Sequence, residues 1–428
     1  MPIIPFSYGK TELLADLPDS RFLGALYSGL HGARPAKPPA ALIQDALSRP
    51  VGAPRLADLC RGKRRVVILA SDHTRPVPSR LLAPPMLDEI RRGNPDAEIT
   101  FLIATGCHRP TTQAELRAKF GEEIFARETI VVHDCDDEEN LRAIGTLPSG
   151  GKLVINRLAA EADLLLSEGF IEPHFFAGFS GGRKSVMPGI ASRETVLYNH
   201  NAAFLADPHA RTGVLSGNPV HEDMRYAAKA AKLAFCVNVV LNAAREPVFA
   251  AAGAPEAVHD LGCGYLRDRC AVRAVPADIV ITSNGGYPLD RDIYQSVKGM
   301  SAAETTIRPG GVIIMLAECG DGHGGQSFYD AFRLAPDVRR LTARILATDP
   351  AHTEVDQWQA QIFARILQRA DVVFVSAAPD AMVRDLHMLP AHSIPEALAL
   401  ADRLLAGRGI QNGGILAIPD GVSVIVNA

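Results

Sequence analysis

The chain has 428 residues, of which 47% are hydrophobic and 21% are charged, and its mean hydropathy is +0.06. These values exclude an intrinsically disordered chain, a coiled coil, a collagen and a small disulfide-stabilised scaffold. At ~150 residues per domain, the length indicates two or three domains. The 44 basic and 48 acidic residues leave a net charge of −4, which makes nucleic acid and an anionic membrane poor partners.

The seven cysteines are scattered and never spaced as Cys-x-x-Cys, which indicates reduced thiols and argues against a zinc–thiolate site. The chain holds no stretch of ~18 uncharged apolar residues, and its first residues lack the basic and apolar regions of a signal peptide. The sequence therefore predicts a cytoplasmic protein that is large enough to hold a buried active site.

Short β-branched runs alternate along the chain with longer segments of helical period. Several runs are apolar at nearly every position, as expected when helices cover both faces of a parallel sheet. The predicted strands are Val66–Ala70, Ile99–Ala104, Thr129–His133, Leu164–Ser167, Cys236–Leu241, Ile279–Ser283, Val312–Leu316 and Val372–Ser376. The predicted helices include Leu81–Arg92, Ala114–Phe120, Glu222–Lys232 and Val355–Arg369. This alternation is typical of an α/β protein with mainly parallel, doubly wound sheets.

A domain boundary is predicted near residues 260–278, where a loop-like stretch with scattered glycines and cysteines precedes a new strand-turn-helix unit. We expect an N-terminal α/β domain over 1–270 and a C-terminal α/β domain over 276–412. The strand-like tail, 413–428, can either close the second domain or return to the first. The Pro/Ala-rich stretch Ala33–Ala41 is interpreted as a connector.

Polar residues follow several predicted strands, at the sheet edge where α/β proteins bind ligands. Ser71–Pro78 follows the first strand and contains Asp72 and Arg75, which could orient one another or belong to a simple turn. Thr105–Pro110 follows the second strand and offers His108 as a general base near neutral pH. A lone histidine is more often structural or exposed, so His108 by itself is a weak signal.

A glycine-rich stretch, Glu168–Ser185, follows the next strand. Clustered glycines let backbone amides approach an anion, which Lys184 and a hydroxyl could join. The stretch nearly spells a Walker A loop, but Arg183 stands where that motif requires its second glycine. A nucleotide triphosphatase is therefore disfavoured, whereas a mononucleotide phosphate in this loop stays attractive. The alternative, a glycine-rich turn with an exposed lysine, does not account for His174 in the same stretch.

The histidine spacing leaves metal binding open. His200 is a third candidate after His108 and His174, but their spacing matches no compact zinc signature. A site with one histidine and a non-protein ligand remains an alternative. Asp321 and His323 could also bind a metal, but the four glycines around them indicate an anion nest or a tight turn equally well.

The second domain repeats this arrangement. The strand Ile279–Ser283 leads into a segment in which Gln295 and Lys298 would share one helix face, with Tyr294 beside Lys298. An amide and an ammonium on that face could bind a carboxylate, and the alternative is a surface pair on an amphipathic helix. Trp358, the only tryptophan, is either a helix core residue or an apolar pocket wall. Together these groups predict a small-molecule enzyme with its active site in an interdomain cleft.

Taken together, these stretches resemble the nickel-pincer-nucleotide lactate racemase family over nearly the whole chain. The resemblance rests on segments in the family's order: SDHTRPVP from Ser71, TGCHRP from Thr105, EPHFFAGFSGGRKSVMPGI from Glu172, NHN from Asn199, GGYPLD and YQSVKG from Gly285 and Tyr294, and ECGDGHGG from Glu318. It implies two α/β domains with the cofactor between them. It also implies an isomerase: a racemase or epimerase of a short 2-hydroxy acid, with lactate as the first expectation.

The resemblance implies a role for each matching residue. The implied cofactor is a nickel-pincer nucleotide (pyridinium-3-thioamide-5-thiocarboxylic acid mononucleotide), and its maturation enzymes are the implied partners. The implied assignments are Lys184 as the covalent link, Asp72, Ser180, Gly181 and Gly182 as further cofactor contacts, His200 as the nickel ligand, His108 and His174 as acid and base, and Arg75, Gln295, Lys298, Tyr294 and Trp358 as substrate contacts.

The chemistry of the implied substrate accounts for two histidines. The α-proton of a 2-hydroxy acid is weakly acidic beside a carboxylate, so the resemblance implies hydride transfer to the pincer carbon through a 2-keto acid. Each histidine would be the base for one enantiomer and the acid for the other. The alternatives are a racemase of another or larger 2-hydroxy acid, a nicotinamide-dependent dehydrogenase, and a non-catalytic nickel or nucleotide carrier. The dehydrogenase is disfavoured because Gly178–Gly182 is followed by Arg183 instead of the last glycine of GxGxxG.

Overall fold

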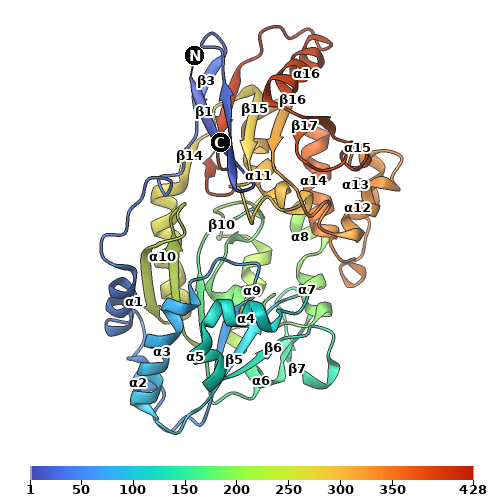
Figure 1. Cartoon of the computed structure of the whole chain (residues 1–428). Helices are drawn as coiled ribbons and strands as arrows, with labels where there is room; N and C mark the ends of the chain where they lie inside the picture. Colours follow the sequence, from blue (N-terminus) through green and yellow to red (C-terminus); the bar gives the residue numbers. More distant parts are fainter. Residues whose placement is uncertain (1, 428) are drawn as a thin grey trace. The chain divides into compact units, whose positions relative to one another are not determined.

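The computed structural model describes residues 2–427, which divide into two compact units, each built around a six-stranded sheet (Figure 1). The N-terminal unit comprises Leu30–His200 and Asp207–Asp268. The C-terminal unit comprises the residues up to Gly29, the short segment Asn201–Ala206 and the residues from Arg269 onward. Both sheets are mainly parallel and covered by helices, which confirms the predicted α/β class.

The sheet of the N-terminal unit has the order β13-β12-β9-β4-β5-β6, and only β13 runs antiparallel to its neighbour. Its strands are β4 (Arg65–Ser71), β5 (Glu98–Ala104), β6 (Thr129–Val132), β9 (Leu164–Phe170), β12 (Leu233–Leu241) and β13 (Pro247–Gly253). Two antiparallel pairs lie outside it, β7 (Leu141–Thr146) with β8 (Lys152–Asn156), and β10 (Pro173–His174) with β11 (Gly178–Phe179).

The helices of this unit pack on both faces of its sheet. They are α1 (Pro39–Ser48), α2 (Leu56–Leu59), α3 (Ser79–Gly93), α4 (Gln113–Phe120), α5 (Glu122–Arg127), α6 (Arg157–Ala160), α7 (Arg193–Asn199), α9 (Pro219–Ala230) and α10 (Pro255–Cys270), with 3-10 turns η1 (Glu138–Asn140) and η2 (Gly182–Ser185). In β4, Val66 and Ile68 point into one core with Leu82 and Met86 of α3. The residue between them, Val67, is also buried and points to the opposite face, because successive strand side chains alternate.

The sheet of the C-terminal unit has the order β18-β17-β16-β15-β19-β3, with all neighbours parallel. Its strands are β3 (Phe22–Ala25), β15 (Ala277–Ser283), β16 (Ile307–Leu316), β17 (Ala370–Val375), β18 (Leu389–Ala391) and β19 (Ile415–Ile418). The other strands pair outside it, β1 (Ile3–Tyr8) with β2 (Thr11–Asp16) and β14 (Ala271–Arg273) with β20 (Ile425–Asn427).

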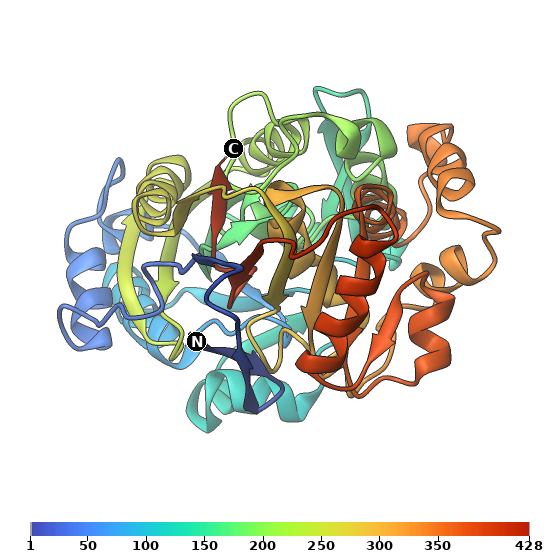
Figure 2. The ribbon, with the colours of Figure 1, turned by 90° about the horizontal axis from the view of Figure 1, so that it is seen from above.

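Helices and the β1–β2 hairpin cover this second sheet. The helices of the unit are α8 (Ala202–Ala206), α11 (Ile293–Thr306), α12 (Gln326–Arg333), α13 (Val338–Leu346), α14 (Gln357–Arg369), α15 (Asp380–Asp385) and α16 (Ile394–Ala406), with the 3-10 turn η3 (Pro350–His352). Figure 2 shows α16 lying along the sheet, where its Ala397 and Ala401 join a core that includes Phe6 of the hairpin and Ile281 of β15. The strands near both chain ends therefore belong to the same core.

The division of the chain differs from the predicted boundaries in two places. The residues up to Gly29 and the tail both belong to the C-terminal unit, because β3 and β19 pair beside β15, so the tail does not return to the N-terminal sheet. The predicted loop at 260–278 is helical as far as Cys270, because buried Cys263, Leu266 and Cys270 recur at the i, i+3, i+7 spacing of one helix face despite Gly264 between them.

The eight predicted strands and four predicted helices are all present, with ends that move by a few residues. The strands near the N-terminus and the hairpin strands β7 and β8 carry only short or interrupted apolar runs and are not predicted. The connector interpretation of Ala33–Ala41 is partly wrong, since α1 begins at Pro39. Over the described part of the chain, every helix is too short or too polar to span a bilayer.

Candidate active site

Three neighbouring parallel strands of the N-terminal unit end where the predicted site residues begin. The strands β9, β4 and β5 are adjacent in the sheet, and their carboxyl ends lead to the segments that carry His174, Asp72 and His108. Loops that leave adjacent parallel strands emerge at one edge of the sheet, which is the usual place for a ligand site in this fold.

Asp72 and His108 form a directed pair at this edge. Asp72 is 2% exposed, and its Oδ2 lies 2.7 Å from His108 Nδ1. Burial raises the pKa of Asp72, but the hydrogen bond and charge of His108, the charge of Arg75 and the Thr74 hydroxyl lower it well below the ordinary value. Because an ionised carboxylate can only accept hydrogen bonds, His108 donates from Nδ1. The other ring nitrogen, Nε2, is therefore the atom available for proton transfer on this exposed side chain.

Further charged groups surround Asp72. The Arg75 amide donates to the Asp72 carbonyl across 3.4 Å, so the two predicted residues belong to one turn. Lys119 of α4 donates to the Ser71 hydroxyl at 3.2 Å. Burial lowers the pKa of Lys119, while the charges of Glu168 and Asp72 raise it. His108, Arg75 and Thr74 are the groups that keep Asp72 ionised, and Lys119 adds a buried cation near them.

His174 and Lys184 form a second pair. The Ala177 amide donates to His174 Nδ1 at 3.3 Å, so a neutral His174 ring carries its proton on Nε2. That Nε2 lies 3.2 Å from Lys184 Nζ. The Lys184 ammonium also lies 5.6 Å from the centre of the Phe176 ring, close enough for a cation–π contact. The predicted covalent lysine and one predicted acid–base histidine are therefore in direct contact.

His200 belongs to the same cluster. It follows the last residue of α7, it is 4% exposed, and its ring packs edge-on against Phe176 with centroids 5.1 Å apart. Burial and, to a smaller extent, the positive charge of Lys184 lower the pKa of His200 to about 3. The imidazole is therefore neutral over the whole physiological range, which is the form that binds a metal.

A chain of backbone hydrogen bonds connects the two pairs. The Gly106 amide, two residues before His108, donates to the Gly189 carbonyl at 2.9 Å. The Gly189 amide in turn donates to the Lys184 carbonyl at 3.1 Å. The structure thus brings Asp72, Arg75, His108, His174, Lys184 and His200 together around one edge of one sheet.

The glycine-rich loop differs from an open anion nest. The amides of Ser180, Gly182 and Lys184 donate to Glu172, Asn238 and Gly181. The Ser180 hydroxyl accepts from the Glu172 amide at 2.9 Å and donates to the Phe170 carbonyl at 3.2 Å. Gly181 has a φ of +75°, and a Cβ there would lie 2.8 Å from the Phe170 carbonyl oxygen. The glycines therefore allow close packing of the loop, and its amides point to protein groups.

The contacts of Arg183 show why an arginine stands where the Walker A motif has glycine. Its side chain is 4% exposed and donates to the carbonyls of Ala177 at 2.8 Å and Ser180 at 3.2 Å. It also contacts His221 Nδ1 at 3.0 Å and His259 Nε2 at 2.5 Å. Burial and the charge of Arg183 lower the pKa of His221 to about 3. The two histidines come from α9 and α10, and no local motif in the sequence points to either of them.

The remaining predicted site residues belong to the C-terminal unit. Tyr294, Gln295 and Lys298 lie in the first turns of α11, which confirms the predicted helix. Asp292 caps that helix through the Gln295 amide at 2.7 Å, and the Lys298 charge acts on Asp292. Trp358 lies in the first turn of α14 and donates its indole N–H to the Tyr294 hydroxyl. The structure thus brings Tyr294 and Trp358 together and places Gln295 and Lys298 on the same helix.

Asp321 and His323 do not join in a metal site. Asp321 pairs with Arg291 at 2.6 Å, and the His323 ring stacks on Tyr329 with centroids 4.7 Å apart. Neither belongs to a group of three potential metal ligands within the described residues. Of the interpretations that the sequence allows for this segment, these contacts favour the tight turn over the metal site.

Comparison with known proteins finds relatives along nearly the whole chain. A family model described as "Lactate racemase N-terminal domain" matches residues 8–213, and one described as "Lactate racemase C-terminal domain" matches residues 272–426. The lactate racemase of Thermoanaerobacterium thermosaccharolyticum is 52% identical over 427 residues, covering 100% of this chain and 99% of its own. That of Lactiplantibacillus plantarum is 46% identical, covering 100% of both chains.

Solved structures agree as well. The lactate racemase apoprotein of Thermoanaerobacterium thermosaccharolyticum superposes with a TM-score of 0.95 at 51% identity, covering 100% of both chains. A Thermotoga maritima protein shares the fold, with a TM-score of 0.69 at 19% identity over 91% of this chain and 98% of its own. The two family models and the full-length relatives show that the chain belongs to the lactate racemase family, a family of isomerases.

Proposed function

We propose that the protein interconverts the two enantiomers of lactate. The observation that carries the proposal is the pair of histidines, His108 and His174, gathered with Lys184 and His200 at one sheet edge. The full-length similarity to two lactate racemases supports lactate over a larger 2-hydroxy acid.

The residues around Lys184 fit a covalently attached nickel-pincer nucleotide. Lys184 offers an amine, and His200 offers a neutral imidazole, a ligand type that suits nickel. When bound, such a cofactor would supply a hydride acceptor at its ring carbon. Asp72, Ser180, Gly181 and Gly182 remain proposed cofactor contacts, although the side chain of Ser180 and the amide of Gly182 are engaged within the protein.

The two histidines would move the proton of the substrate hydroxyl. Asp72 holds the proton of His108 on Nδ1, so His108 Nε2 is free to accept the hydroxyl proton of one enantiomer. His174 presents Nε2 beside Lys184 and would supply the proton of the product when His108 is the base. For the other enantiomer the roles reverse, so a turnover in the opposite direction, or proton exchange with solvent, restores both histidines.

Cationic side chains would bind the substrate carboxylate. Arg75 offers a planar guanidinium next to the His108 pair, and Lys298 offers an ammonium on α11. Gln295, Tyr294 and Trp358 remain proposed substrate contacts in the C-terminal unit. A fixed carboxylate would restrict the movement of the planar 2-keto acid, whose two faces must both become available.

The test uses full-length protein made together with the cofactor maturation enzymes. L-Lactate labelled with deuterium at the α-carbon should give D-lactate until the two are equal, without added NAD and with the label retained in ordinary water. Loss of the label would contradict hydride transfer, and net formation of pyruvate would favour a dehydrogenase. An adduct mass on the Lys184 peptide together with bound nickel would support the proposed cofactor.

A matched pair of variants separates catalysis from folding. His108→Gln should lower kcat by about 10²–10⁴-fold, the range for loss of a general base. His209→Gln removes a comparable contact, because His209 Nδ1 lies 2.9 Å from Asp207, but that pair is exposed and local. Equal activities of the two variants would remove His108 from the mechanism.

A further inference from the structure

Two thiols meet where neighbouring strands of the N-terminal sheet end. Cys107 lies four residues beyond Ile103, the last residue of β5 that pairs with β6, and Cys135 lies three residues beyond its partner Val132. The Thr105 hydroxyl donates to the His133 carbonyl at 2.7 Å, so the two loops leave the sheet side by side. The Cys107 and Cys135 side chains are hydrogen-bonded to each other, and both are free thiols.

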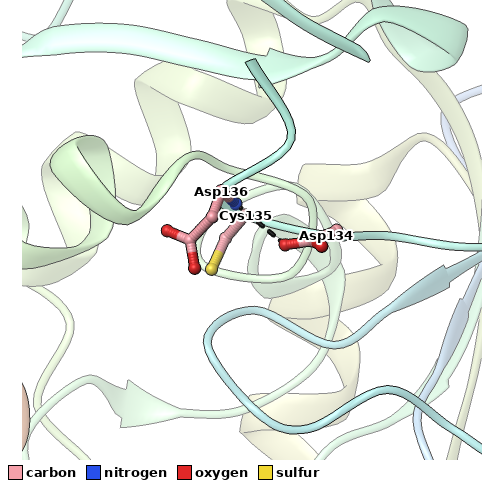
Figure 3. A group of neighbouring side chains, drawn as sticks. All are labelled: Asp134, Cys135 and Asp136. Carbon is pink, nitrogen blue, oxygen red and sulfur yellow. Dashed lines mark hydrogen bonds between the residues drawn. The ribbon is translucent and has the colours of Figure 1, made fainter. Parts of the chain in front are cut away.

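Arg193 gives this pair a charged neighbour. Its guanidinium donates to both Asp136 oxygens at 2.8 and 2.7 Å, and its amide donates to the Cys135 carbonyl at 3.1 Å. Figure 3 shows the Cys135 sulfur beside the Asp136 carboxylate, with Asp134 accepting a hydrogen bond from the Asp136 amide. Because the Arg193 cation already occupies the Asp136 carboxylate, this cluster is better explained by thiol chemistry than by metal binding.

The two thiols differ in acidity. The hydrogen bond from Cys107 lowers the pKa of Cys135, and the Arg193 charge lowers it further. Burial and the negative charges of Asp136 and Asp134 oppose this shift, but the pKa stays below its ordinary value. The same thiol–thiol hydrogen bond and burial raise the pKa of Cys107. Burial raises the pKa of every other cysteine in the described chain (Cys60, Cys236, Cys263, Cys270 and Cys319). Cys135 is therefore the cysteine whose thiolate, the form that reacts with oxidants, is most favoured.

We propose that Cys107 and Cys135 are a reversible thiol–disulfide modification site for a hydroperoxide oxidant. Cys135 lies beside Arg193 and is only 6% exposed, whereas Cys107 is half-buried, so a small oxidant is the class that fits. Cys135 is the thiol that reacts first, and Cys107 is the resolving thiol, already in contact with it.

The reaction balances in two steps. With hydrogen peroxide as the oxidant, the Cys135 thiolate attacks one oxygen, the O–O bond breaks, and the departing hydroxide takes up the proton that the Cys135 thiol released, which forms water. Cys107 then attacks the sulfur of the Cys135 sulfenic acid, the S–S bond forms, and the hydroxyl leaves with the Cys107 proton as a second water. Two thiols are oxidised to one disulfide, and one peroxide is reduced to two waters.

The modification would act next to the proposed acid–base residue. Cys107 directly precedes His108, so the disulfide would join the His108 loop to the loop that Arg193 holds. This consequence rests on the proposed function, whereas formation of the disulfide does not. The experiment below is therefore read from the protein's covalent state and not from racemisation.

The first measurement is a non-reducing peptide map of the folded, full-length chain after treatment with stoichiometric hydrogen peroxide and blocking of the remaining thiols. We expect a peptide pair that joins Cys107 to Cys135, formed before any other cysteine is oxidised and removed by dithiothreitol. Prior oxidation of another cysteine, or a Cys135 that stays reduced, would overturn the proposal. This map needs no variant, so it does not depend on how a substitution folds.

Variants then test the order of the steps. Cys107→Ser should stop at a sulfenic acid on Cys135 that dimedone traps, because the resolving thiol is absent. Arg193→Gln should slow oxidation of Cys135 by about tenfold if loss of the charge raises the pKa of that thiol by about one unit, and Arg193→Lys should restore much of the rate. Arg225→Gln removes another carboxylate-paired arginine and serves as the control. Equal rates for Arg193→Gln and Arg225→Gln would contradict the assigned order.

Discussion

At the scale of single residues, Asp72 has the largest consequence for the proposed chemistry. It accepts hydrogen bonds from the Thr74 hydroxyl at 2.6 Å and from His108 at 2.7 Å. One buried carboxylate therefore stabilises the turn after β4 and fixes the tautomer of the His108 ring. The turn and its charges were predicted from SDHTRPVP, but the direction of the hydrogen bond to His108 was not. That direction depends on two loops which are 36 residues apart in the chain.

Asp72→Asn tests this orientation. The amide can donate as well as accept, so the preferred tautomer of His108 is lost and kcat for lactate racemisation should fall by about 10²–10⁴-fold. The change in KM should be smaller, since the carboxylate of the substrate is assigned to cationic groups. Chiral analysis of the product measures the rate, and Asp207→Asn at the exposed His209 pair is the control. Similar losses in both variants would contradict an orienting role for Asp72.

Gly181 carries a second residue-scale prediction. Gly181→Ala should destabilise the protein by more than about 2 kcal/mol, because the positive φ is strained for alanine and the new Cβ meets the Phe170 carbonyl and the Asn238 side chain at 2.8 Å. Gly62 has a similar φ of +70° with no atom within 4 Å of a built Cβ, so Gly62→Ala isolates the backbone strain. Urea unfolding measures both. Equal losses would show that the close approach at Gly181 costs little.

At the scale of elements, the turn η2 is held by a buried arginine. Arg183 donates to backbone carbonyls of its own loop and to histidines of α9 and α10, so it ties the segment that carries Lys184 to two helices. Burial lowers the pKa of Arg183 to about 10, so the cation still persists at neutral pH. Position 183 was recognised in the sequence only as a departure from the Walker pattern.

Arg183→Gln should therefore lower the free energy of unfolding by on the order of 3 kcal/mol, because several buried acceptors lose their donor together. Arg211→Gln is the matched control, since Arg211 also donates to backbone carbonyls, Asp207 and Ala210, in a less buried loop. Denaturant unfolding followed by circular dichroism gives both values. A loss no larger than that of the control would show that Arg183 is dispensable for holding η2.

The contact between Arg183 and His221 predicts a pH dependence of the free energy of unfolding. The pKa of His221 is lowered to about 3 in the folded protein by burial and then by Arg183, whereas the unfolded chain binds that proton near pH 6.5. Between these values the unfolded state holds more protons, so stability falls as the pH decreases, by roughly 1.4 kcal/mol per unit for this group. Urea unfolding from pH 7 to 4.5 should show a steeper fall in the wild type than in His221→Gln. Parallel curves would exclude His221 as the source.

At the scale of the whole molecule, the C-terminal unit is assembled from both ends of the chain. Its sheet places β19 between β15 and β3, so strands that are far apart in sequence complete one core (Figure 1). Such non-local pairing cannot be read from a local hydrophobic run. This is why the sequence allows two destinations for the tail, whereas its described residues, 413–427, have one in the structure.

Deleting the residues from Gly413 onward should unfold the C-terminal unit, because β15 and β3 lose the strand between them. The sheet of the N-terminal unit contains no strand from that segment and should keep its protection. Hydrogen exchange with peptide resolution distinguishes the two units. Deletion from Ile425 onward removes only β20 and should cost less. Equal protection of β16 in both truncated chains would contradict a central role for β19.

The sequence by itself determined the α/β class, the strands with continuous apolar runs and the polar segments that follow them, because these are local signals of hydrophobic period and turn chemistry. It also determined the family, through motifs that keep their order. Only the tertiary structure decided the partners: Asp72 with His108, Arg183 with His221 and His259, and Cys107 with Cys135. The physical reason is that hydrogen bonding, burial and charge depend on distances in space, and those distances join residues that are far apart in the chain.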